Sequence, residues 1–289
     1  MADDPSTAAG PEAPLVHPHA LRRLGRAAPL TAHPAMRWRD GEASACEEQL
    51  AEETPVTLVY NAVPHVVMML TPADLEAFAL GFSYTEGLIT SPDDVREVTV
   101  VPHSRGIDVN LTVGDAAFAI VEGRARRMSG RTGCGVCGTD NVDSVLRPLA
   151  PVGPGVTVRG SAIHRALDGL EARQALNAAA HAVHAAGWAD PSGELRLARE
   201  DVGRHNALDK LIGALLLERA DPQAGFLVIT SRASFEMVHK AASFGTGLLA
   251  AVGGATALAV RLAHASRLTL AGFVRRGGHV VYSWPERVT

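Results

Sequence analysis

The second half of this chain alternates short apolar runs with amphipathic segments, and this alternation narrows the folds that it can adopt. In the amphipathic segments, apolar residues recur at helical spacing, as at Leu208, Leu211 and Leu215. Strands that alternate with helices form an α/β layer, in which helices pack on a sheet. Strands are expected at 195–199, 226–230, 268–274 and 280–284, and helices from Asn206 onward, at 235–245 and at 256–264.

A Pro- and Gly-rich stretch at 148–155 separates this half from the rest and predicts a domain boundary. An Ala-rich segment follows, and its pattern predicts one helix over 163–186. We interpret residues 161–289 as a C-terminal α/β domain. A cysteine-containing loop and the linker precede it at 131–160.

The first half predicts a smaller α+β domain at 35–130. Thr71 as the cap, followed by Pro72, is typical of a helix start, and Gly87 is expected to end that helix. Strands are expected at 55–61, 66–70, 95–101, 107–113 and 117–121. The fold class is therefore α/β, as a two-domain chain with a smaller N-terminal α+β domain.

Composition and the chain ends argue against several classes of protein. The chain has 289 residues, 47% of them hydrophobic, which is enough for two soluble domains. Residues 1–34 are rich in Ala, Pro and Gly and are expected to form a disordered tail without a secretion signal. No apolar run of membrane-spanning length is present, and the net charge of −4 argues against a nucleic-acid partner. The odd number of cysteines, 3, favours a reducing compartment, so a cytoplasmic location is expected.

Two of these cysteines, Cys134 and Cys137, lie three positions apart with glycine before, between and after them. Glycine gives the backbone conformations that other residues avoid, so an exposed, mobile loop is expected. Arg126, Arg127 and Arg131 lie just upstream, and nearby cations favour the reactive thiolate form of cysteine. This loop can therefore present two reactive sulfur atoms to another molecule.

Four interpretations of the loop compete on residue types alone. A structural zinc site needs four ligands in most cases, and the chain has no second cysteine pair, although Cys46 or histidines could complete one. A structural disulfide would close too small a ring to stabilise much. A thioredoxin-like redox pair needs a helix start, which Gly135 and Gly138 disfavour. Carriage of sulfur or an acyl group on a thiol ranks level with redox chemistry.

Polar residues gather in three loops at predicted strand ends, at 200–206, 231–234 and 275–279. In open α/β sheets, ligands bind beyond the carboxyl ends of the strands. Helix starts favour anions and arginines bind phosphate, so a phosphate-bearing ligand is expected in one crevice. The residues that suggest it are Arg204, Arg232, Arg275 and Arg276, with helix starts at Asn206 and Ser234. The alternative is a solvated ion-pair cluster at 200–204 with Asn206 as a simple cap.

Four sequence blocks resemble the FdhD family, the accessory sulfurtransferases of formate dehydrogenase. The blocks are Tyr60-Asn61 with Met68–Leu75, Gly81-Phe82 and Glu86–Ile89; Gly133–Gly138; Arg199–Lys210; and Ser231–Val238. The resemblance extends from about residue 50 to the end of the chain, and the second and third blocks are highly specific.

The resemblance implies a sulfur carrier that takes persulfide sulfur from a cysteine desulfurase and delivers it to the molybdenum bis(molybdopterin guanine dinucleotide) cofactor of formate dehydrogenase. Cys134 is then the main carrier, and Cys137 assists it. The implied fold of the C-terminal domain is a cytidine-deaminase-like three-layer α/β fold. The implied partners are the desulfurase, the catalytic subunit of formate dehydrogenase and a second copy in a homodimer, with no nucleic acid and no membrane. No permanently bound metal is expected.

The cofactor is expected in the strand-end crevice, with its guanine near the segment that follows Gly272. The expected contacts are Phe273, Val274, Arg275, Arg276, Gly277, Gly278, Arg232, Ser231, Ser234, His205 and Asn206. Two alternatives remain at this stage. One is a chaperone that holds the cofactor without transferring sulfur, and the other is a divergent paralogue that serves another molybdoenzyme.

Overall fold

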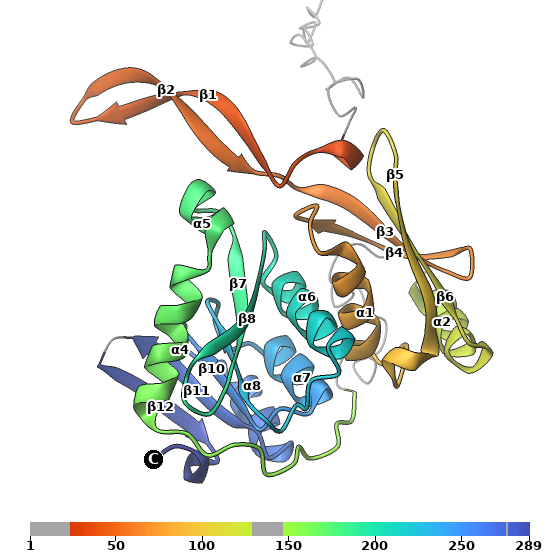
Figure 1. Cartoon of the computed structure of the whole chain (residues 1–289), viewed down its shortest axis with the longest axis vertical. Coiled ribbons are helices and arrows are strands. Elements are labelled where there is room, and N and C mark those ends of the chain that lie inside the picture. The colour runs from red at the N-terminus through yellow and green to blue at the C-terminus, as the bar shows by residue number, and fades with distance from the viewer. Residues whose placement is uncertain (1–23, 129–146, 276) are drawn as a thin grey trace, which may run out of the picture.

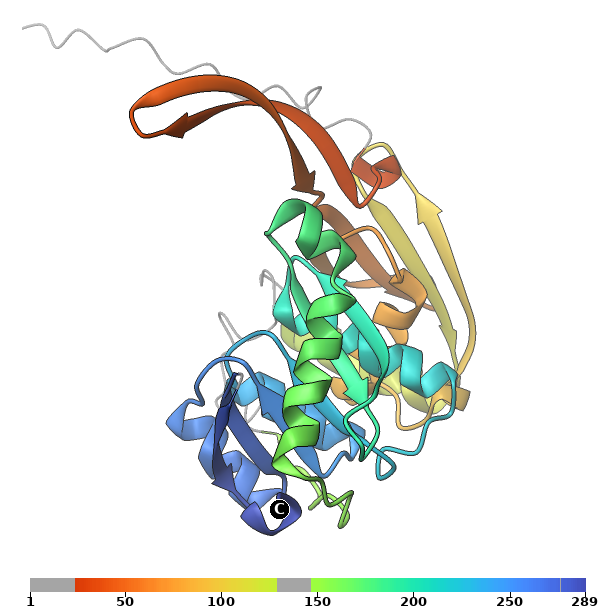
Figure 2. The ribbon, with the colours of Figure 1, turned by 60° about the vertical axis from the view of Figure 1, so that its left-hand side comes forward.

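The structure is a computed structural model and describes residues 24–128, 147–275 and 277–289. Within these residues, the chain forms a four-stranded sheet in its first half, a six-stranded sheet in its second half and a long hairpin that projects from the body (Figure 1). A view turned by 60° shows the hairpin curving away from both sheets (Figure 2). No helix in the described part of the chain is long and apolar enough to cross a membrane.

The six-stranded sheet has the order β12-β11-β10-β9-β7-β8. Its central strands β9, β10 and β11 run parallel, whereas β7, β8 and β12 each pair with a neighbour in antiparallel fashion. The strands are β7 (His184–Ala189), β8 (Leu195–Asp201), β9 (Phe226–Ile229), β10 (Leu248–Ala251), β11 (Thr269–Arg275) and β12 (Gly278–Ser283).

Helices cover both faces of this sheet and make three layers. One face packs against α4 (Gly160–Ala172), and the other against α6 (Arg204–Leu217), α7 (Phe235–Phe244) and α8 (Ala257–Ala265). A separate hydrophobic core lies on each face of the sheet, and successive side chains of β9 point into them alternately. Phe226 and Val228 belong to the core on the α4 side, whereas Leu227 and Ile229 belong to the core on the other side. The three-layer α/β arrangement expected from the sequence is thus confirmed.

The four-stranded sheet has the order β4-β3-β6-β5, and the helix α1 covers it. Its elements are β3 (Thr54–Tyr60), β4 (Val63–Leu70), α1 (Leu75–Thr85), β5 (Val95–Pro102), β6 (Ile107–Val113) and α2 (Asp115–Met128), with short 3₁₀ turns at Leu24–Arg26, Pro92–Asp94 and Pro285–Arg287.

The two halves join where α1 crosses α6. A Cβ atom on Gly81 would lie 1.9 Å from the carbonyl oxygen of Asp209, and one on Gly213 would lie 1.7 Å from that of Ala77. Only glycine lets the two backbones approach this closely, so the crossing fixes the relative position of the two sheets.

Three predictions of secondary structure were wrong. The predicted strand at 117–121 is part of the helix α2. The predicted helix at 163–186 is instead α4, the short α5 (Ala175–Ala180) and the start of β7, because His181 takes a left-handed conformation with a φ of 52° that ends α5. The tail predicted through residue 34 is wrong for residues 30–34, which belong to the strand β1 (Leu30–Arg39).

Two helix caps also differ from the prediction. Gly203 rather than Asn206 caps α6, so Asn206 lies inside the first turn of that helix. Asp74 rather than Thr71 caps α1, without a side-chain hydrogen bond. β10 was not predicted, and neither was the hairpin formed by β1 and β2 (Glu42–Ala51).

Candidate functional site

The carboxyl ends of β8, β9, β10 and β11 lie at the same edge of the six-stranded sheet. β7 runs antiparallel to both β8 and β9, so β8 points in the same direction as β9. All three predicted strand-end loops therefore lie along one edge. β8 and β11 are four strands apart, however, so the loops at the two ends are about 19 Å from one another. A ligand that contacts both must be extended.

The loops after β9 and β10 bond directly to one another through their backbones. Ala233 N donates to Gly254 O over 3.1 Å, and Gly253 N donates to Ser231 O over 3.0 Å. Ser231 and Ser234 are buried in this junction, while Arg232 is exposed beside them. The guanidinium group of Arg232 is thus positioned on a rigid turn at the edge of the sheet.

The segment Phe273–Gly278 continues this edge at the end of β11. Phe273 is 50% exposed and has a φ of 51°, which is unusual for a non-glycine residue and holds the ring outward over Gly254. Val274 is buried, Arg275 is exposed, and Arg276 lies outside the described residues. An exposed aromatic ring beside an exposed arginine suits the stacking of a nucleobase.

Gly277 and Gly278 border an open pocket of about 620 Å³ whose other wall is the start of α4. Arg159, His164 and His279 line this pocket, and the Nε2 atom of His164 lies 3.1 Å from the Nδ1 atom of His279. The volume is typical of small-molecule sites. Arg159 and His164 were not predicted, because the start of α4 is distant in sequence from the loop that it meets. His279 belongs to the predicted loop at 275–279.

His205 lies at the opposite end of the edge and faces the start of α7. Its Nε2 atom is 3.9 Å from the Oε2 atom of Glu236, which also accepts a 2.7 Å hydrogen bond from the Ser234 hydroxyl. His205 and Ser234 act together to lower the pKa of Glu236 to about 2, so this carboxylate stays charged at neutral pH. The structure thus brings together two of the predicted contacts, His205 and Ser234.

Asn206 is placed differently, because it faces the first half of the chain. It is buried, and its Nδ2 atom donates to Met69 O and to Asp201 Oδ1, each over 2.9 Å. Asp201 also accepts from Thr71 N over 3.0 Å and pairs with Lys210 at 2.7 Å. Asp201 and Lys210 are fully buried, so the alternative of a solvated ion-pair cluster is wrong for Asp201.

A second buried charge cluster lies where α1 meets α7. Lys240 contacts Asp209 at 2.9 Å and Glu86 at 3.2 Å, and Thr85 donates a 2.7 Å hydrogen bond to Asp209. Burial tends to raise the pKa of Glu86, but Lys240 and then Arg147 outweigh it and hold that pKa at about 2. Burial likewise tends to lower the pKa of Lys240, but Asp209 and Glu86 raise it. Burial raises the pKa of Asp209, and Lys240 acts against that shift. The cluster links the two halves through these ion pairs and the Thr85 hydrogen bond.

This cluster also holds the described residues on both sides of the cysteine pair. Arg124 in α2 and Arg147 both donate to the carbonyl oxygen of Glu86, and Arg147 bonds the Glu86 carboxylate over 2.9 Å. Cys134 and Cys137 themselves lie outside the described residues, between these two arginines. Cys46 lies on the hairpin as a free thiol, and its Sγ atom donates to Ala35 O.

The described residues contain no group of three or more His, Cys, Asp or Glu side chains that could hold a metal ion. Two histidines, the half-buried His65 and the buried His239, lie near the charge cluster. Burial, followed by the charge of Arg124, lowers the pKa of His65 to about 4, and burial followed by Arg147 does the same for His239. Both rings are therefore neutral at pH 7.

The family model described as "FdhD/NarQ family" matches residues 51–289. The chain belongs to the FdhD/NarQ family. A protein of Cupriavidus necator named sulfur carrier protein FdhD is 48% identical over 96% of this chain and 96% of its own length. A protein of the same name from Bordetella petrii is 47% identical over 88% of this chain and 92% of its own.

The fold agrees with this assignment. A crystal structure from Desulfotalea psychrophila, described as a candidate formate dehydrogenase accessory protein, matches with a TM-score of 0.74 and 26% identity. The match covers 90% of this chain and all of that one.

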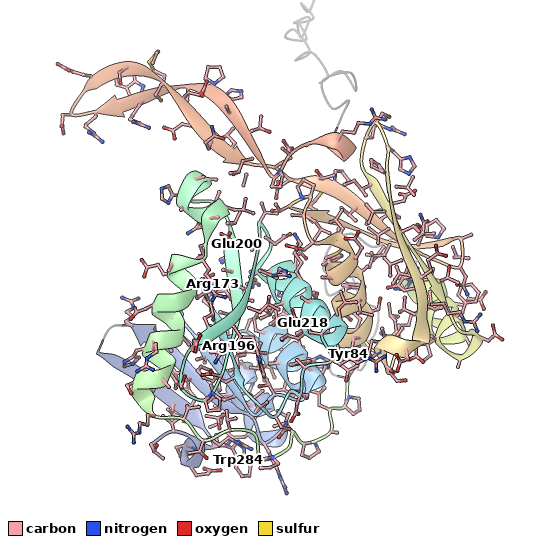
Figure 3. All side chains as sticks on the ribbon, in the orientation of Figure 1. Tyr84, Arg173, Arg196, Glu200, Glu218 and Trp284 are labelled. Atoms are coloured by element: carbon pink, nitrogen blue, oxygen red, sulfur yellow. The ribbon has the colours of Figure 1, made fainter. Side chains whose placement is uncertain are left out.

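Much of the block Arg199–Lys210, one of the two highly specific blocks of the resemblance, supports the architecture. Glu200, at the α5 end of β8, accepts hydrogen bonds from the backbone of Leu176 and Asn177 at the start of α5 (Figure 3). Asp201 and Lys210 form the buried pair described above. The sequence carried a signal for this role, because Asp209 and Lys210 interrupt the apolar stripe of α6, where charged residues are buried only when paired.

The buried, neutral His239 predicts a pH dependence of stability. The pKa of His239 is about 4 when folded and about 6.5 when unfolded, so the unfolded chain binds more protons between these values. The contribution of His239 to the free energy of unfolding should be at its maximum above pH 6.5. As the pH falls toward 4, the free energy of unfolding should decrease by up to about 3 kcal/mol because of this residue. Urea unfolding at pH 7 and pH 4.5 measures this loss, which His239→Gln should reduce. His33→Gln changes an exposed histidine and is the control. An equal loss of stability between pH 7 and pH 4.5 in the wild type, His239→Gln and His33→Gln would contradict the prediction.

Proposed function

We propose that this chain is a sulfur carrier that receives persulfide sulfur from a cysteine desulfurase and delivers it to the molybdenum bis(molybdopterin guanine dinucleotide) cofactor destined for formate dehydrogenase. The observation that carries the proposal is the pair Cys134 and Cys137 in a chain of the FdhD/NarQ family. Relatives at 47% and 48% identity that are named sulfur carrier proteins support the first part of it.

The chemistry needs only the two thiols and their partners. The thiolate of Cys134 attacks the outer sulfur of the desulfurase persulfide, which forms a Cys134 persulfide and releases the desulfurase cysteine as a thiolate. The thiolate of Cys137 can then attack the Sγ atom of Cys134. This forms a Cys134–Cys137 disulfide and expels the outer sulfur as hydrosulfide, so that two thiolates are oxidised and one sulfur is reduced. A cellular thiol reductant would restore the pair.

The buried charge cluster supports this role by fixing where the cysteine segment begins and ends. Arg124 and Arg147 are both bonded to Glu86, which is itself held by Lys240. The described residues on both sides of the cysteine pair are thus anchored to the same cluster.

Intact mass spectrometry after incubation with a cysteine desulfurase and cysteine tests the proposal directly. The wild type and Cys46→Ala should each gain the mass of a sulfur atom, and a reductant should remove it. The absence of any added sulfur in the wild type would favour a chaperone that holds the cofactor without transferring sulfur.

For the cofactor, we propose the edge of the six-stranded sheet, with the guanine near Phe273 and the phosphates near Arg232, the start of α7 at Ser234, and Arg275. The exposed ring of Phe273 and the two exposed arginines support this position. Because the edge is long, an extended dinucleotide is a better fit than a mononucleotide.

Charge-assisted contacts with phosphate contribute roughly 1.5–3 kcal/mol each. Arg275→Ala and Arg232→Ala should therefore each weaken guanosine diphosphate binding about tenfold or more. Calorimetric titration measures this, with Arg165→Ala, an arginine on α4 that bonds Ser192 O, as the control. Added salt should weaken the wild-type interaction as well. Unchanged affinity in both edge variants would place the nucleotide elsewhere, for example in the pocket lined by Arg159.

A further inference from the structure

The β11–β12 hairpin carries Phe273 and Arg275, two of the proposed nucleotide contacts, on an irregular part of its ladder. Gly272 pairs with Val280. The next pair is Arg275 with Gly278, so β11 has one residue more than β12 between the two pairs. Such a bulge interrupts the regular hydrogen bonds and bends the strand. A contact outside the ladder is therefore needed to fix the end of the β11–β12 hairpin.

His279 supplies this contact on β12. Its Nδ1 atom lies 3.1 Å from the Nε2 atom of His164 on α4, which runs beside β12 (Figure 1). The two rings meet edge to face with their centroids 5.2 Å apart. Gly160 leaves room for the ring, because a Cβ atom there would lie 3.0 Å from the Cε1 atom of His279. On β11, the buried Val274 belongs to the core on the α4 side, so both strands are attached near α4.

The start of α4 is a firm support for the histidine contact. Ile163 and Ala166, which lie on either side of His164 in the sequence, are fully buried. Gly160 N donates to Thr289 O over 2.9 Å and ties the first turn of the helix to the end of the sequence. The imidazole of His164 thus projects from a fixed element. It is only half-buried, so it can still exchange protons with solvent.

The contact between the two imidazoles depends on their protonation. In a neutral pair one ring donates and the other accepts, and one added proton gives a charge-assisted hydrogen bond. A second proton removes the acceptor and leaves two cations in contact, which repel one another. Burial, followed by the neighbouring His164, lowers the pKa of His279 from its usual value of about 6.5. The second proton is therefore expected only in acid.

Other charged side chains lie on the elements around the pair. They are Arg159, Arg165 and Asp168 at the start and on the body of α4, Arg275 on β11, and Glu286 and Arg287 in the turn after β12. Among the described residues that line the pocket beside the pair, Arg159 is the one with a permanent charge. Its positive charge also disfavours a second proton on the pair.

We propose that His164 is a positioning residue for nucleotide binding, which holds the end of the β11–β12 hairpin through His279 at neutral pH and releases it in acid. This inference rests on the proposed nucleotide position at Phe273 and Arg275. Arg275 pairs with Gly278, the residue before His279. Loss of the histidine contact therefore leaves Arg275 less well placed for a phosphate. Histidine suits this role, because its charge changes near neutral pH.

Calorimetric titration of guanosine diphosphate into the full chain tests this role. His164→Ala and His279→Ala should each weaken binding about fivefold at pH 7, which corresponds to one lost hydrogen bond. Arg165→Ala, at the next residue of α4, is the control and should leave the affinity unchanged. His164→Gln keeps a side chain that can donate to the Nδ1 atom of His279, so it should restore most of the affinity.

The pH profile separates this role from a purely structural one. Between pH 7 and pH 5, the affinity of the wild type should fall about fivefold more than that of His164→Gln, since only the wild type places two cations in contact. The titration of the nucleotide itself affects both proteins equally. Hydrogen exchange of the amides of β12 without nucleotide, corrected for the intrinsic exchange rate, should show the same difference.

Three results would overturn the proposal. They are equal affinity in the wild type and both alanine variants, the same pH profile in the wild type and His164→Gln, and unchanged amide protection of β12 in His164→Ala. A wild type that binds no guanosine diphosphate would overturn the proposed nucleotide position, and with it this role of His164. The exchange data would then still show whether the histidine pair holds the β11–β12 hairpin, so the two failures are distinguishable.

Discussion

Replacement of Cys134 by serine is expected to reduce formate dehydrogenase activation to the level found without the protein. A serine hydroxyl cannot form a persulfide, and the alkoxide needed for attack is not available at neutral pH, whereas a cysteine thiolate is. The measurement is formate dehydrogenase activity in cells that lack their own FdhD and express the variant. Intact mass after incubation with a desulfurase should show no sulfur on that residue.

Stability separates this effect from a folding defect. The glycine-rich sequence around Cys134 predicts that little area is buried there, so the free energy of unfolding of Cys134→Ser should equal that of the wild type. Cys46→Ala is the matched control, because Cys46 lies on the hairpin of β1 and β2, where its thiol donates to Ala35 O and to the Glu48 carboxylate. Full activation by Cys134→Ser would exclude Cys134 as the obligatory carrier. Loss of activation in Cys46→Ala would show that Cys46 is required, which would contradict the proposed roles of the cysteines.

Elements with a clear period were predictable from the sequence. β3, β6 and α7 match their predicted ranges within a residue or two, because each combines a regular apolar pattern with an end signal such as Gly245 after α7. The predicted strand at 117–121 failed because a short apolar run does not distinguish strand from helix. β7 was hidden in an Ala-rich stretch, where tertiary pairing with β8 and β9 overrides helix propensity.

The sequence does contain a turn signal for the hairpin of β1 and β2. Asp40 and Gly41 lie between its strands with φ values of 52° and 89°, and two positive φ values are typical of the Asp-Gly turns that close two-residue hairpins. The prediction of a tail rested on Ala, Pro and Gly content, and this content did not reveal that residues 30–34 belong to β1.

The candidate site was only partly predictable for a different reason. Strand-end loops follow from the α/β pattern, so the positions of Arg232 and Phe273 could be expected. The charge cluster of Glu86 and Lys240 joins residues more than 150 positions apart, and no local pattern reports such a contact. The motif around Asn206 is specific to the family, but its specificity alone does not distinguish a ligand contact from a buried link between the two halves.

Lys210→Met is expected to lower the free energy of unfolding by about 3–5 kcal/mol, because it leaves a buried carboxylate without its cation. The Nζ atom of Lys210 is 2.7 Å from Asp201 Oδ2 and donates to Thr71 O over 2.8 Å, and the side chain is fully buried. Burial lowers the pKa of Lys210, and Asp201 acts against that shift. The pair therefore joins β8 and α6 to the start of α1.

Urea unfolding at pH 7 measures the effect, and the chain provides a matched control. Arg219 and Asp93 also form an ion pair between the two halves, at 2.7 Å, but both side chains are mostly exposed. Arg219→Met should cost less than about 1 kcal/mol, since water replaces the lost partner. Asp201→Asn combined with Lys210→Met removes both charges and should recover part of the loss, because no unpaired buried charge remains. If Lys210→Met were as mild as Arg219→Met, burial of the pair would not be what holds the two halves together.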